Sequence, residues 1–148
     1  MLATTAPPPS DVEARRIDDV ESYVRARRLK ESVFGTHGRT FTDDELAASF
    51  ARDAKVTYGA WLDGEMVAAA DATFTRAGAY LTGGATLPEA RGRGAYRALV
   101  RARWDDAAAR GTPALAIGAG DMSRPILERL GFEQVLQFRR LQSVRSER

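Results

Sequence analysis

A turn of two glycines, Gly92 and Gly94, stands between a strand-like segment and an amphipathic helix and constrains the fold more than any other feature. Residues 79–87, before the turn, are mostly small, apolar or β-branched. After it, apolar side chains recur at helical spacing, at Tyr96, Leu99, Val100, Trp104 and Ala107. Glycines let the backbone bend close to a ligand, and the first amides of a helix attract anions. The segment therefore predicts a phosphate cradle, to which three side chains add positive charge: Arg91, Arg93 and Arg97.

The remaining periodicities predict an α/β fold with a mixed, largely antiparallel central sheet flanked by helices. Residues 56–62, 66–75 and 79–87, separated by turns, are expected to form three consecutive antiparallel strands. An edge strand and two helices precede them, at 12–17, 20–34 (capped by Asp18 or Asp19) and 42 to about 53 (opened by a Thr42–Glu45 capping box). After the helix that follows the glycine turn we expect a buried strand, a short helix and a final strand or strand pair, at 114–119, 123–130 and 132–141.

Composition limits the classes of protein to which the chain can belong. Its 148 residues fit one domain, expected over 11–148, behind a proline-rich and disordered lead over 1–10. The absence of cysteine excludes disulfides, a thiolate nucleophile and cysteine-based metal sites. We expect a cytoplasmic protein with no membrane partner, because no signal peptide or long apolar run is present. The 22 basic and 20 acidic residues are interleaved without a basic stripe, which argues against a nucleic-acid partner.

Two motifs resemble those of the Gcn5-related N-acetyltransferase (GNAT) family, over nearly the whole chain from about Asp11. The family's acyl-CoA signature is Gln or Arg, two residues, Gly, one residue, then Gly or Ala. Here it reads Arg91-Gly92-Arg93-Gly94-Ala95-Tyr96, which differs at the last position. Residues 123–132, which end in Leu130-Gly131-Phe132, are similar to the family's second motif. The order and separation of the two motifs strengthen the match.

The resemblance implies an acyl-CoA N-acyltransferase fold with acetyl-CoA as co-substrate and no metal. The implied binding residues are Thr86 and Leu87 for the pantetheine arm, and Arg91, Gly92, Arg93, Gly94, Ala95, Tyr96 and Arg97 around the pyrophosphate. A splay between the strands 79–87 and 114–119 would leave backbone groups that pantetheine amides can satisfy. Tyr96 either narrows the pocket or points into the core.

Other interpretations of the glycines fit less well. A dinucleotide fingerprint requires a third glycine where Arg97 stands, and a P-loop requires Gly-Lys-Ser or Gly-Lys-Thr. A strand-to-helix connection without any ligand remains the structural alternative.

The implied reaction is acetyl transfer to a primary amine by direct attack in a ternary complex, with a backbone amide near Thr86 or Leu87 as oxyanion donor. A small-molecule amine is the favoured acceptor. The alternatives are a transferase acting on protein amines and a noncatalytic acyl-CoA-binding module. The last strand also allows a homodimer.

The sequence offers three candidates for the acid and the base of this reaction. Leu127 stands where many family members carry the tyrosine acid. The candidates are Ser123, which is otherwise a helix cap, Asp121, which is otherwise a cap or loop acid, and Asp71, which either faces the cleft or lies on the exposed face of the sheet. Tyr80 and Thr82 are expected to share one face of their strand, and His37 is expected to be exposed.

Overall fold

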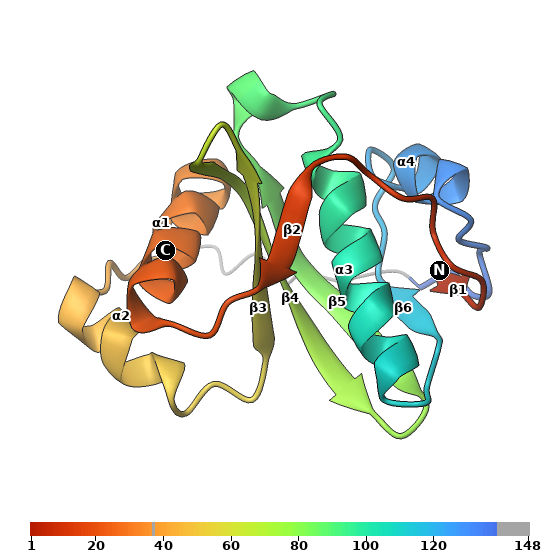
Figure 1. The fold of residues 1–148 in the computed structure, drawn as a ribbon, viewed down its shortest axis with the longest axis horizontal. Helices are drawn as coiled ribbons and strands as arrows, with labels where there is room; N and C mark the ends of the chain where they lie inside the picture. Colours follow the sequence, from red (N-terminus) through yellow and green to blue (C-terminus); the bar gives the residue numbers. More distant parts are fainter. Residues whose placement is uncertain (37, 139–148) are drawn as a thin grey trace, which may run out of the picture.

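The computed structural model describes residues 1–36 and 38–138, so His37 and residues 139–148 lie outside the described part (Figure 1). A six-stranded sheet in the order β1-β6-β5-β4-β3-β2 forms the centre. Its strands are β1 (Leu2–Ala3), β2 (Glu13–Arg16), β3 (Val56–Leu62), β4 (Glu65–Thr75), β5 (Gly78–Thr86) and β6 (Leu115–Ile117). The helices are α1 (Val20–Phe34), α2 (Asp43–Phe50), α3 (Ala95–Ala109), α4 (Arg124–Arg129) and a 3₁₀ turn, η1 (Pro88–Ala90). The predicted fold class is confirmed.

Helices cover the two faces of the sheet (Figure 1). On one face α1 packs over β3, β4 and β5, where Tyr23, Ala26 and Leu29 meet the strands in the smaller core. On the other face α3 packs over β2 to β5 and buries Leu99 and Val100 in the larger core. The alanine-rich sequence of β4 suits this position, because small side chains on both faces let the helices approach closely.

The helix starts follow the capping chemistry of the sequence. The Asp19 carboxylate accepts a hydrogen bond from the backbone N–H of Ser22 at the start of α1. Thr42 and Glu45 form the reciprocal capping box at the start of α2. Both predicted starts are confirmed, and α2 ends at Phe50, earlier than expected.

Strands β3, β4 and β5 are consecutive and antiparallel, as predicted. The register between β4 and β5 shifts between Ala69 and Asp71, so that a bulge forms in β5. Gly83 takes a φ of +60° there, a conformation that residues with a side chain rarely adopt. The bulge therefore depends on glycine.

The parallel pair of β5 and β6 is short. Only Ala79, Tyr80 and Leu81 pair with β6, and the last partner is Ile117. Beyond this point β5 continues to Thr86, whereas β6 has ended. The predicted splay between these two strands is present, with its open side along the second half of β5.

The N-terminal segment departs from the expected disordered lead. Leu2–Ala3 form β1, which pairs antiparallel with the outer edge of β6, and Ala3 and Pro7 are fully buried. Pairing with β1 satisfies the backbone N–H and C=O groups on the outer edge of β6. This gain orders the N-terminal segment despite its proline-rich composition.

The expected final strand over 132–141 also differs from the structure. Of its described part, only Glu133 pairs, in an isolated bridge with Leu2, and residues 139–141 lie outside the described part. The edge of β6 is already taken by β1, so no place beside it remains. In the described residues no helix is long and apolar enough to cross a membrane, and no group of three or more His, Cys, Asp or Glu side chains is arranged for a metal ion.

Candidate functional site

The glycine turn forms as the sequence predicts, between η1 and α3. Gly92 and Gly94 have φ values of +76° and +89°, both in the left-handed region. Gly94 is the N-cap of α3 and has no side chain to cap it, and the first backbone hydrogen bond into its carbonyl comes from Ala98. The amides of Ala95, Tyr96 and Arg97 are therefore free at the positive end of the helix.

Two amides in the turn are already occupied. The Arg91 N–H donates to the Pro88 carbonyl and the Arg93 N–H donates to the Ala90 carbonyl. Of the residues expected around the pyrophosphate, Arg91 and Arg93 therefore have side chains to offer a ligand but no free backbone amide. The side chains of Arg91, Arg93 and Arg97 are exposed and surround the turn with positive charge.

The open edge of β5 presents Thr86 and turns Leu87 away. The Leu87 N–H donates to the Val67 carbonyl on β4. Because N–H and C=O groups alternate in direction along an antiparallel strand, those of Thr86 face the open side instead. The backbone groups of Gly84, two residues before Thr86, are expected to face the same open side. The expected role of the Leu87 amide is thus corrected, whereas the backbone of Thr86 is available.

Tyr96 lies between α3 and β5. Its Cε2 atom is 3.0 Å from the position that a Cβ at Gly84 would occupy, and the ring packs against the larger core. Burial raises the pKa of its phenol. The core alternative therefore describes this side chain, and the glycine opposite gives it room.

Asp71 is buried on the face of the sheet that α1 covers. Its Oδ1 atom accepts hydrogen bonds from the Lys30 ammonium (2.6 Å) and from the Thr57 hydroxyl (3.0 Å). Its Oδ2 atom lies 2.9 Å from the position that a Cβ at Gly83 would occupy, so the bulge is what leaves room for it. Asp71 therefore does not lie on an exposed face of the sheet, which was one of the two positions that the sequence left open.

A polar row crosses three strands at this level of the sheet. Thr57 on β3 pairs with Asp71, which pairs with Thr82 on β5, so the three side chains share the α1 face. The Thr82 hydroxyl is buried and has no hydrogen-bond partner within the described residues. A buried hydroxyl in this state costs free energy unless a ligand or water satisfies it. Thr82, which is the member of this row nearest the splay, is therefore the one whose hydroxyl can still form a hydrogen bond.

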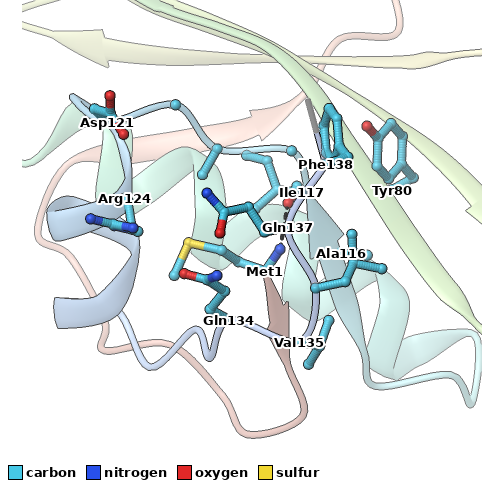
Figure 2. A pocket seen from close by; sticks show the side chains of 14 residues that line it. Met1, Tyr80, Ala116, Ile117, Asp121, Arg124, Gln134, Val135, Gln137 and Phe138 are labelled. Atoms are coloured by element: carbon cyan, nitrogen blue, oxygen red, sulfur yellow. Dashed lines mark hydrogen bonds between the residues drawn. The ribbon is translucent and has the colours of Figure 1, made fainter. Parts of the chain in front are cut away.

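Asp121 and Ser123 lie elsewhere, near the end of β6. Asp121, Arg124, Tyr80 and Phe138 line a pocket of about 420 Å³ beside the splay (Figure 2). The Asp121 side chain is exposed, whereas the Ser123 hydroxyl exchanges hydrogen bonds with Gly120 across the turn before α4. Ser123 thus closes this turn and makes no side-chain cap of α4.

Leu127 is completely buried in the larger core. The aliphatic side chain of leucine carries no transferable proton, so this position supplies no proton donor.

Comparison with known proteins identifies the family. The profile of the Acetyltransferase (GNAT) family matches residues 23–132, most of the chain. The chain belongs to the GNAT acetyltransferase family. No curated protein matches it significantly.

Solved structures share this GNAT fold at low sequence identity. An acetyltransferase of Trypanosoma brucei is 24% identical, with a TM-score of 0.69, over 90% of this chain and 100% of that one. The aminoglycoside acetyltransferase AAC(6')-Iy, bound to the bisubstrate analogue CoA-S-monomethyl-acetylneamine, is 20% identical, with a TM-score of 0.70, over 91% and 99%. A predicted acetyltransferase of Clostridium acetobutylicum with acetyl-CoA is 21% identical, with a TM-score of 0.63, over 88% and 96%.

Two residues of this candidate site, Lys30 and Gly83, were not predicted from the sequence. Lys30 lies seven residues after Tyr23 and four after Ala26, so the helical period places it on the buried stripe of α1. Gly83, next to another glycine inside a strand, is a typical signal of a bulge. Both signals are in the sequence, but only the packing of α1 on the sheet brings Lys30 to Asp71, and only the pairing of β4 with β5 brings Gly83 there.

Proposed function

We propose that this GNAT protein is an acetyl-CoA-dependent N-acetyltransferase whose acceptor is the primary amine of a small molecule. The observation that carries the proposal is the continuity of the uncapped start of α3 with the open edge of β5. An anion held by the free amides at Ala95 to Arg97 leaves the edge at Thr86 and Gly84 for an amide-containing arm. CoA combines a pyrophosphate with such an arm.

The length of the open edge supports this placement. From Leu87 back to Gly83 a strand covers about 13 Å, at about 3.3 Å per residue. A pantetheine arm of similar length, starting from the pyrophosphate at the glycine turn, would bring its thioester to the bulge. The amide of Gly84 faces the same open side as that of Thr86, because the two residues are two positions apart. It is our candidate for the oxyanion donor.

Asp71 is the best placed of the three candidate catalytic residues. The neutral amine attacks the thioester carbon, an N–C bond forms, the C–S bond breaks, and the sulfur leaves with a proton from solvent. The amine loses one proton, which the Oδ2 atom of Asp71, on the side of Gly83, would accept. Ser123 is engaged by Gly120, and Asp121 lies in the pocket at the end of β6. Direct attack suits a chain without a cysteine nucleophile.

The choice of a small-molecule amine rests on the neighbours and on the pocket. A structural neighbour holds a bisubstrate analogue of CoA and an acetylneamine. Here the pocket at the end of β6, which Tyr80 and Asp121 help to line, has the size of a small-molecule site. Action on protein amines remains the second choice. A single domain, a cytoplasmic location and a homodimer stay predictions, but the domain cannot start at residue 11, because β1 belongs to the sheet.

The test has two stages. Acetyl-CoA at millimolar concentration should raise the thermal unfolding temperature, because it binds only the folded state. Release of free CoA is then followed with a thiol reagent across aminoglycosides, polyamines and lysine peptides, and the chain itself adds no thiol. No thermal shift would refute CoA binding. Binding without turnover on any amine would refute the enzyme and favour the noncatalytic module, which the apolar residue at Leu127 makes the natural rival.

A further inference from the structure

The Lys30 side chain already places a primary amine inside the candidate site. It reaches from α1 to the sheet, and its Nζ atom lies 2.6 Å from Asp71 Oδ1. Only 11% of the Lys30 side chain and 12% of the Asp71 side chain are exposed. The Thr57 hydroxyl shares the same carboxylate oxygen. The α1 face of the sheet therefore contains a built site for a primary amine, and the chain itself occupies it.

This amine lies next to the bulge of β5. The Lys30 Cδ atom is 3.7 Å from the position of a Cβ at Gly83, and Asp71 Oδ2 is 2.9 Å from that position. The bulge is also the place to which an arm along the open edge of β5 would bring a thioester. The lysine side chain has four rotatable bonds, so its amine can turn from the carboxylate toward the edge without a change in the backbone.

The surroundings of Lys30 favour loss of its proton. Burial is the main influence and lowers the pKa of the amine, while the facing Asp71 opposes it. Arg27 on the same helix lowers the pKa further, and Asp53 raises it. Asp71 also provides an acceptor for the proton within hydrogen-bond distance. A buried amine with a base in contact is the arrangement that nucleophilic lysines use.

We propose that Lys30 is itself an acceptor and is acetylated by the acetyl-CoA that this chain binds. The inference rests on the proposed function. The neutral Nζ attacks the thioester carbon, an N–C bond forms and the C–S bond breaks. The amine proton passes to Asp71, and CoA leaves as the thiol after taking a proton from solvent. The product is an uncharged acetyl-lysine that no longer pairs with Asp71, so each molecule reacts once.

The small number of lysines in the chain provides an internal control for the test. The chain has two lysines, Lys30 and Lys55, and Lys55 is exposed beside β3. Lys55 thus reports chemical acetylation without catalysis. The full chain is incubated with acetyl-CoA and no added amine, and the mass of the intact protein and of its peptides is followed with time. We expect a gain of one acetyl group on Lys30, at a rate at least about tenfold above that of Lys55, despite the greater exposure of Lys55.

Variants separate catalysis from accessibility. Lys30→Arg keeps the charge facing Asp71 and should abolish the modification while the fold and acetyl-CoA binding remain. Asp71→Asn should slow acetylation of Lys30 by about a hundredfold and leave Lys55 unchanged. Acetylation of Lys30 at the rate of Lys55, or at an unchanged rate in Asp71→Asn, would overturn the inference.

The two proposals can fail separately. Release of CoA to an added amine, with Lys30 unmodified in the same sample, would overturn the self-acetylation and leave the enzyme in place. Acetylated Lys30 without turnover on any added amine would support self-acetylation and overturn the proposed transfer to a small-molecule amine. Absence of acetyl-CoA binding would overturn both.

Discussion

The ring of Tyr96 packs against Gly84, with its Cε2 atom 3.0 Å from the place where a Cβ at residue 84 would lie. Tyr96 is the position at which the chain departs from the GNAT signature. Gly84 lies across from it on β5, at the open edge that we assign to the pantetheine arm. The large side chain on α3 and the missing side chain on β5 are therefore complementary, and the departure leaves the helix close to the sheet.

Gly84→Ala should destabilise the protein by about 1–2 kcal/mol, because the added methyl overlaps the Tyr96 ring. Tyr96→Ala should cost about 2–3 kcal/mol through the cavity it leaves. In the double variant the cost of the alanine at position 84 should vanish, since its neighbour is gone. Urea unfolding of the four proteins measures this coupling, and additive costs would contradict the contact.

Gly92→Ala should weaken acetyl-CoA binding by about tenfold, or ~1.4 kcal/mol. A Cβ at Gly92 meets no atom within 4 Å and projects into the open space of the turn, where we place the pyrophosphate. Gly111→Ala is the matched control, because Gly111 has nearly the same φ (+77°) and an equally open position at the other end of α3. Titration calorimetry should give the control wild-type affinity, and equal losses would point to backbone strain instead of the cradle. Gly94 suits the test less well, because a Cβ there would lie 3.2 Å from the Ser10 hydroxyl.

Asp71→Asn should lower kcat for an amine acceptor by about a hundredfold and leave the affinity for acetyl-CoA unchanged. The amide no longer accepts a proton, while the fold keeps a side chain of the same size facing Lys30. Asp121→Asn and Ser123→Ala should keep kcat near the wild-type value. Steady-state kinetics with circular dichroism as the check on folding measure this. A large loss in Asp121→Asn alone would move the base to the pocket at the end of β6.

Alkaline solutions should destabilise the protein partly through Tyr58. Burial, and then its hydrogen bond to Asp106, raise the pKa of the Tyr58 phenol above its ordinary value. The folded state therefore holds this proton where the unfolded state releases it, so stability is complete below about pH 10 and falls as the pH rises further. Tyr58→Phe should show a shallower loss of unfolding free energy above pH 10 than the wild type. Parallel curves from urea unfolding at pH 8 to 11 would contradict this account.

Local patterns in the sequence determine most of the elements. Capping by Asp19 and by the Thr42–Glu45 pair sets the starts of α1 and α2. The alternation of side chains over residues 56–62 and the strand-like segments after it predict β3 to β5, and two glycines predict the turn before α3. These features depend on residues only a few positions apart, so they can be read before the fold is known. The resemblance to the GNAT family rests on the same turn together with the second motif, at residues 123–132.

Only the tertiary structure decides which distant groups meet. It pairs Leu2–Ala3 with β6 and thereby excludes the expected final strand from that edge. It also turns the Leu87 amide to β4 and brings Lys30 from α1 onto Asp71 of β4. The physical reason is that strand pairing and burial join backbone and side-chain groups far apart in the sequence, and no local pattern states which partner each group finds. The sequence alone determines the glycine turn before α3, and the fold decides that the Lys30 amine faces Asp71.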